Sequence, residues 1–166
     1  AECTAISGEL FNALLTFQSS GALRRAVTDP AHESKSALIK DLFGKSASSS
    51  VVALLEEVVA LRWSKTVDVL NAVEQLAVEA EATAANANNA LDLVEEELYA
   101  FIKVLVANND LRQALNNSLD AGDHKAALVK SIFASKYNDS SVRLLEQLVR
   151  VLNRRSIELA LYDFID

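Results

Sequence analysis

The sequence contains two similar stretches about 90 residues apart. "LRRAVTDPAHESKSALIKDLFG" runs from Leu23 to Gly44, and "LRQALNNSLDAGDHKAALVKSIFA" runs from Leu111 to Ala134. Similarity at a fixed period indicates a structural unit that is built more than once. We therefore expect the fold of this chain to contain two units of related structure in tandem.

The match extends beyond these stretches and includes polar residues. Leucine matches alone carry little weight, because any buried helix face uses leucine. Polar identities are harder to obtain by chance. They pair Glu9 with Glu97 and Arg24 with Arg112 at a shift of 88, and Lys35 with Lys125, Lys40 with Lys130 and Glu56 with Glu146 at a shift of 90.

The pattern of apolar residues predicts helices throughout. Apolar residues make up 51% of the chain, only five residues are Gly or Pro, and no segment alternates with the two-residue period of a strand. We expect Asn89 and the serines of 45–50 to cap helices, and Gly44 to end one. The predicted helices are Gly8–Val27 with a break at Gln18–Gly21, Glu33–Phe43, Val51–Ala85 with a bend near Trp63-Ser64, Ala90–Ala107, Leu111–Leu115, His124–Phe133, and Ser141 to the end.

These elements predict an all-α fold of two tandem homologous helical bundles joined by a long shared helical segment. The segment Val51–Ala85 is apolar on more than one face, which is typical of a helix buried between others. We expect the first, truncated bundle to occupy residues 1–64 and the second to occupy residues 65–166.

Charge and composition exclude several classes of function. The net charge of −7 argues against general binding to nucleic acid or anionic lipid. We expect the basic residues Arg143, Arg150, Arg154 and Arg155 to lie on solvated helix faces, with contact to an acidic partner as the alternative. No apolar run is long enough for a transmembrane helix, and no signal peptide is visible. The lone Cys3 predicts a reducing compartment, and the lack of methionine predicts a processed chain or a piece of a longer protein.

No pattern in the chain predicts catalysis, a metal site or a cofactor. The two histidines, His32 and His124, have no cysteine or carboxylate cluster at ligand spacing, and no phosphate-binding or metalloprotease motif is present. The remaining signal is apolar helix surface on Val67–Ala80 and on the last helix. That surface either forms a groove for a partner's helix or packs within the chain.

One long stretch resembles a known family. "LDLVEEELYAFIKVLVANNDLRQALNNSLDAGDHKAALVKSIFASKYNDSSVRLLEQLVRVLNRR", from Leu91 to Arg155, resembles the N-terminal helical domain of the ATP synthase delta subunit, the oligomycin sensitivity-conferring protein family. "GELFNALLTFQSSGALRRAVTDPAHESKSALIKDLFG", from Gly8, is similar in the same way. "LRWSKTVDVLNAVEQLA", from Leu61, resembles the longer actinobacterial form with a duplicated helical domain.

The resemblance implies a non-catalytic subunit of the peripheral stalk of the proton-translocating ATP synthase, on the inner face of the plasma membrane. It implies that N-terminal helices of the alpha subunits bind the domain's first and fifth helices, which map to Lys65–Ala82 and Ser141–Asp163. We expect the groove to contain Val69, Val73, Leu76, Leu148 and Leu152. It also implies that b-type stalk subunits bind a C-terminal domain not present here. The alternative hypothesis is a helical-repeat adaptor or regulatory protein of a soluble complex.

Overall fold

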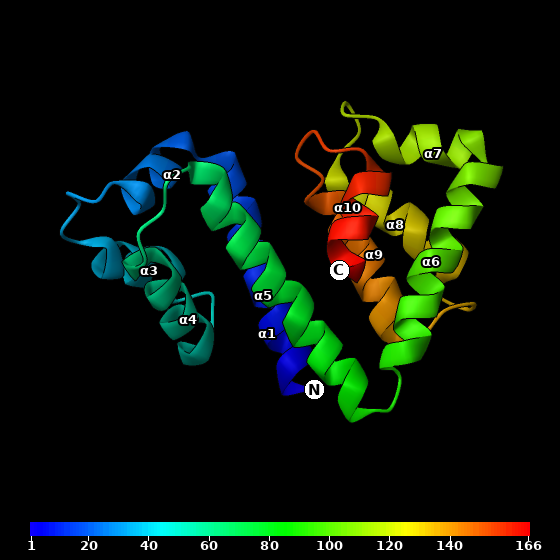
Figure 1. The fold of residues 1–166 in the computed structure, drawn as a ribbon, viewed down its shortest axis with the longest axis horizontal. Coiled ribbons are helices and arrows are strands. Elements are labelled where there is room, and N and C mark those ends of the chain that lie inside the picture. Colours follow the sequence, from blue (N-terminus) through cyan, green and yellow to red (C-terminus); the bar gives the residue numbers. More distant parts are fainter. The chain divides into compact units, whose positions relative to one another are not determined.

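The structure is a computed structural model that describes residues 1–166, and all of its regular elements are helices (Figure 1). The all-α prediction is therefore confirmed. The helices are α1 (Glu2–Ser19), α2 (Gly21–Thr28), α3 (Lys35–Phe43), α4 (Ser49–Ala60), α5 (Thr66–Ala87), α6 (Leu91–Ala107), α7 (Asn109–Asn116), α8 (Gly122–Phe133), α9 (Asp139–Arg150) and α10 (Ile157–Ile165).

The chain divides into two compact units, Ala1–Ala80 and Glu81–Asp166. The division falls inside α5, so this helix begins in the first unit and ends in the second. At 22 residues α5 is the longest helix, with a length of about 33 Å. The predicted division into residues 1–64 and 65–166 follows the resemblance and would assign all of α5 to the second domain.

The first unit has an aliphatic and aromatic core. Helices α1 and α5 run side by side (Figure 1), and the Ser7 hydroxyl of α1 donates a 2.7 Å hydrogen bond to the Ala77 carbonyl of α5. The rings of Phe17 and Phe43 connect α1 to α3, with 5.8 Å between their centroids. Further fully buried side chains of this unit are Leu10, Leu14, Val27, Ile39, Val51 and Leu55.

The second unit also has a core of aliphatic and aromatic side chains. Its first helix, α6, contacts α7 and α9, and α8 packs along α9. Phe101 of α6 meets Phe133 of α8 edge to face, with 5.1 Å between the ring centroids. Further fully buried side chains of this unit are Leu105, Leu115, Val129, Leu145, Leu148, Ile157 and Leu161.

Side-chain caps explain where several helices begin. Ser20, Ser48, Asn108 and Ser156 each accept a hydrogen bond from the backbone N–H three residues later, at the start of α2, α4, α7 and α10. The predicted cap within the serine cluster is confirmed at Ser48, whose Oγ accepts from the Val51 N–H. Asn138 caps α9 by accepting from the Ser140 N–H.

Two local predictions were wrong. The residue before α6 is Ala90, which makes no side-chain cap, and Asn89 instead has a left-handed backbone with φ of 54°. The last helix is not continuous, because α9 ends at Arg150 and α10 begins at Ile157. Asn153 and Arg154 between them have φ of 47° and 70°, and such residues cannot continue a right-handed helix.

The bend predicted near Trp63-Ser64 is a complete break. Helix α4 ends at Ala60 and α5 begins at Thr66. Leu61, which follows α4, has an extended backbone with ψ of 157°. The break allows α4 and α5 to lie at different angles, and this geometry forms the groove described next.

Candidate functional site

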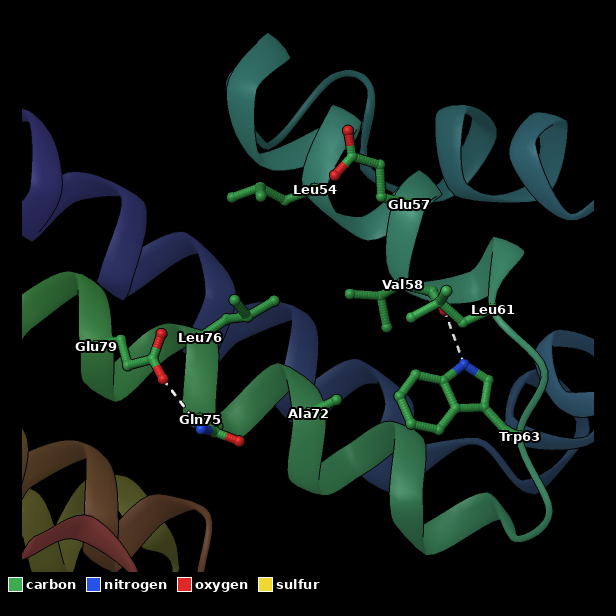
Figure 2. Close-up of a pocket in the computed structure, with 9 residues that line it drawn as sticks. All are labelled: Leu54, Glu57, Val58, Leu61, Trp63, Ala72, Gln75, Leu76 and Glu79. Carbon is green, nitrogen blue, oxygen red and sulfur yellow. Dashed lines mark hydrogen bonds between the residues drawn. The ribbon is translucent and has the colours of Figure 1, made fainter. Parts of the chain in front are cut away.

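A groove of about 440 Å³ lies between α4 and α5 in the first unit (Figure 2). Four residues of α4 and the turn after it form one wall, four residues of α5 form the other, and Trp63 lies between them in sequence. The lining residues are Leu54, Glu57, Val58, Leu61, Trp63, Ala72, Gln75, Leu76 and Glu79. Most of this lining is apolar, and no histidine, cysteine, lysine or arginine takes part in it.

Trp63 is the only tryptophan of the chain and is held in place at one end of the groove. Its indole N–H donates a 2.7 Å hydrogen bond to the Val58 carbonyl, one of the last carbonyls of α4 (Figure 2). A buried indole needs such a partner, and a helix end offers carbonyls without intrahelical donors. The bond therefore fixes the ring and satisfies the end of α4 together.

Both walls carry a carboxylate. Glu57 extends from α4 and is exposed, with no ion-pair partner within the chain. Glu79 on α5 accepts a 3.0 Å hydrogen bond from the side-chain amide of Gln75 (Figure 2). The groove thus has an apolar floor and an acidic rim, and it lacks any cluster of convergent groups suited to catalysis.

The five predicted groove residues lie in different places. Leu76 lines the α4–α5 groove and is half-buried. Val69 and Val73 are buried on α5 in the first unit. Leu148 on α9 and Leu152 after it are buried in the second unit. Their role in binding a partner stays a prediction.

Sequence reasoning did not identify Leu54, Glu57, Leu61 and Trp63 as lining a groove. A usable signal was present: Leu54, Glu57, Val58 and Leu61 have the spacing of a single row along a helix. This row lies beside the fully buried Val51 and Leu55. A second apolar row next to the core row indicates a second contact surface on the same helix.

A carboxylate of the first long helix holds the start of the fourth helix in both units. In the first unit, Glu9 of α1 accepts the backbone N–H of Ser48 at 3.1 Å and its hydroxyl at 2.8 Å. In the second, Glu97 of α6 accepts the Asn138 N–H at 3.0 Å on each oxygen and the Ser141 hydroxyl at 3.3 Å. Glu97 is buried, whereas Glu9 is partly exposed.

Three of the four arginines in the predicted basic patch are paired within the chain. Arg143 binds the buried Glu81 at 2.7 Å, and Arg150 binds Asp123 at 2.9 Å. Arg155 binds Asp163 and also donates to the carbonyls of Val151 and Leu152, at the end of α9. Arg154 is exposed and has no such partner. The three paired arginines are also partly exposed, so they combine solvent contact with ion pairs inside the chain.

The histidines make only local hydrogen bonds. His32 Nδ1 accepts from the Ser34 N–H at 3.3 Å, and His124 Nδ1 lies 2.8 Å from an Asp120 oxygen. The His124 contact lowers the pKa of the partly exposed Asp120 carboxyl. No group of three or more potential metal-ligating side chains occurs, and no helix has the length and apolar character needed to cross a membrane.

Comparison with known proteins gives the family. The family model described as "ATP synthase delta (OSCP) subunit" matches residues 78–160, half of the chain. The chain belongs to the ATP synthase delta subunit family. The resemblance seen in the sequence is thereby confirmed, and the matched segment extends from the second half of α5 into α10.

Individual members of the delta family align over most of the chain. The ATP synthase subunit delta of Streptomyces coelicolor is 37% identical over 139 residues, covering 82% of this chain and 51% of the relative. Those of Acidothermus cellulolyticus and Streptomyces griseus are 35% and 32% identical and cover 96% of this chain. The chain spans 59% and 60% of their lengths. It thus corresponds to about half to three-fifths of such a delta subunit.

Proposed function

We propose that this chain is a non-catalytic part of the peripheral stalk of a proton-translocating ATP synthase. The observation that carries the proposal is the family match over residues 78–160. The role we propose is mechanical. In that role, helical bundles clasp partner helices and hold the catalytic head to the stalk.

The proposed partners are N-terminal helices of the alpha subunits. The residues that would bind them are Val69, Val73 and Leu76 on α5, with Leu148 and Leu152 on and after α9. They are all aliphatic, as a helix-in-groove contact requires. The b-type stalk subunits would bind a domain outside this chain, and the assembly would lie on the inner face of the plasma membrane.

We also propose that the two units are copies of one helical domain. Each contains a long helix, a short helix, two helices of about three turns and a further helix, in the same order. The carboxylates of Glu9 and Glu97, 88 positions apart, each accept the backbone N–H of the residue that caps the fourth helix. A shared polar bond between the same elements supports common descent better than matching leucines do.

Binding of an alpha-subunit peptide tests the partner proposal. A synthetic peptide with the N-terminal ~20 residues of the alpha subunit from the same source would be titrated into the chain by calorimetry. We expect saturable binding that Leu152→Asp weakens at least about tenfold, because a charge in an apolar contact is poorly tolerated. Leu119→Asp, at a side chain that is 95% exposed, is the control for an added surface charge, whereas Leu152 is only 7% exposed.

Circular dichroism would check that both variants are folded, and Leu148→Ala provides a milder second variant. Binding that is absent in the unmodified chain would contradict the alpha-subunit assignment. Binding that is equally tight in all variants would contradict the choice of residues.

A further inference from the structure

Equivalent faces of the two units differ in their exposure to water. The α4 wall of the groove contains Leu54, Val58 and Leu61. The residues 90 positions later are Leu144, Leu148 and Val151. The latter three are all buried, whereas Leu61 is 57% exposed and Leu54 is only half-buried. The row is thus covered along its whole length on α9, whereas on α4 only Val58 is buried and the side chains of Leu54 and Leu61 reach the solvent.

The two walls of the groove have the same spacing. Leu54, Glu57, Val58 and Leu61 stand at positions i, i+3, i+4 and i+7, and so do Ala72, Gln75, Leu76 and Glu79. Each wall is therefore a straight row of side chains along its helix, over about two turns. An apolar groove lined by two such rows fits the apolar face of a third helix.

The charge of the rim restricts what that third helix can be. Each wall includes one glutamate, Glu57 on α4 and Glu79 on α5, and no basic side chain lines the groove. A helix with lysine or arginine on both flanks of its apolar stripe would meet one carboxylate on each side. An acidic helix would be repelled from both walls.

We propose that the α4–α5 groove of the first unit is a docking site for a single amphipathic helix whose apolar stripe is flanked by lysine or arginine. Its leucine-like side chains, repeating at i, i+3, i+4 and i+7, occupy the floor beside Leu61 and Leu76. Its basic side chains pair with Glu57 and Glu79. The site shares Leu76 with the proposed alpha-subunit contact, but it goes beyond that function because the α4 wall and the charges of Glu57 and Glu79 belong to this groove alone.

Trp63 provides a direct measurement, since it is the only tryptophan and lines this groove. The probe is a tryptophan-free 18-residue helical peptide with leucine at i, i+3, i+4 and i+7 and lysine on both flanks. The control peptide has glutamate in place of every lysine. We expect the lysine peptide to shift the Trp63 emission to shorter wavelength in a saturable way, and the glutamate peptide to have no effect.

Two variants separate the apolar and the charged parts of the contact. Leu61→Asp should weaken the binding of the lysine peptide by about tenfold or more, because it places a charge on the apolar floor. Glu57→Arg should weaken the binding of the lysine peptide about fivefold, as expected for the loss of an exposed ion pair. The same variant should improve the binding of the glutamate peptide. The matched controls are Leu119→Asp and Glu96→Arg, both at exposed positions of the second unit. They should leave the binding of both peptides unchanged.

Several results would overturn the proposal. These are an unchanged Trp63 emission at saturating lysine peptide, equal binding of the two peptides, or insensitivity to Leu61→Asp in a variant that is folded by circular dichroism. A dimer that Leu61→Asp dissociates in sedimentation experiments would assign the groove to a second copy of the chain instead. None of these results depends on alpha-subunit binding, which the Leu148 and Leu152 variants test separately.

Discussion

Replacing Glu97 by alanine should destabilise the second unit by about 1.3–4 kcal/mol. The buried carboxylate accepts the Asn138 N–H on both oxygens at 3.0 Å and the Ser141 hydroxyl at 3.3 Å. Alanine leaves the N–H in a part-buried position without an acceptor, which costs about 1–3 kcal/mol. It also removes a negative charge from the N-terminus of α9, which contributes about 0.3–1 kcal/mol.

The first unit contains the matched control. Glu9 makes the same bond to Ser48, but its hydrogen bonds are exposed, so water can replace the carboxylate. Glu9→Ala should therefore cost less than about 1 kcal/mol. Glu97→Gln keeps one acceptor oxygen and loses the charge, so its effect should lie between that of Glu97→Ala and that of the unmodified chain.

Native-state hydrogen exchange and urea unfolding would measure these effects. Glu97→Ala should lower the protection of the Asn138 amide and the midpoint of unfolding of the second unit, while Trp63 fluorescence reports on the first unit. The reasoning would be refuted if Glu9→Ala cost as much as Glu97→Ala. It would equally be refuted if the Asn138 amide kept its full protection in Glu97→Ala.

Three further predictions follow from individual contacts. Arg143→Ala should lower the free energy of unfolding by about 2–3 kcal/mol in thermal or urea unfolding, because it leaves the carboxylate of Glu81, only 2% exposed, without its cation. The double variant Glu81→Leu with Arg143→Leu should be within about 1 kcal/mol of the unmodified chain. Leu145→Ala should cost about 2–5 kcal/mol in urea unfolding, because it opens a cavity at a fully buried site. His124→Ala should raise the pKa of Asp120 towards its usual value, which carbon NMR would measure. Because the contact with His124 lowers this pKa, the contact stabilises the fold at pH values above the usual pKa of Asp120. That stabilisation is lost as the pH falls through the lowered pKa. An Asp120 pKa unchanged by His124→Ala, or a larger loss for the double leucine variant than for Arg143→Ala, would contradict these contacts.

Local sequence signals predicted most of the helices. The break at Gln18–Gly21, the helix end at Phe43 and the cap at Ser48 were all readable, because each depends on residues within one turn of the chain. The spacing of apolar residues also identified side chains of the core, such as Leu10 and Leu98. Elements with strong local signals are those that single-sequence reasoning can place.

The break between α9 and α10 was not predicted, and both local and distant contacts support it. The segment contains no glycine or proline, and its composition favours helix continuation. The left-handed backbone of Asn153 and Arg154 is compensated by Arg155, which donates to the carbonyls of Val151 and Leu152. The amide oxygen of Asn116 on α7 accepts the N–H of Ile157 at 2.8 Å and holds the start of α10. Of these contacts, the Asn116 bond joins residues far apart in the sequence, and a helical pattern cannot reveal it.

The candidate site was less predictable than the fold for a related reason. Spacing identifies which side chains share a row on a helix, but it does not say which rows are covered. Leu61 and Val151 are 90 positions apart in rows of the same composition, yet one is exposed and the other is fully buried. Only packing decides this difference, so the open groove became visible only in the structure.

Residues that are identical at matching positions of the two units do not all make the same contacts. Arg24 donates to the carbonyls of Phe17 and Gln18 at the end of α1, whereas Arg112 donates to the Asn109 side chain. Matching letters at these positions therefore do not preserve a contact. Glu9 and Glu97 differ from them, because each joins the first helix of its unit to the cap of the fourth and so fixes the spacing of two elements. If the two units are copies of one domain, a bond that determines how two helices are arranged would be retained in both copies. The surface residues of the two copies would be free to change. The proposed duplication consequently rests more on this single pair of carboxylates than on the number of matching residues.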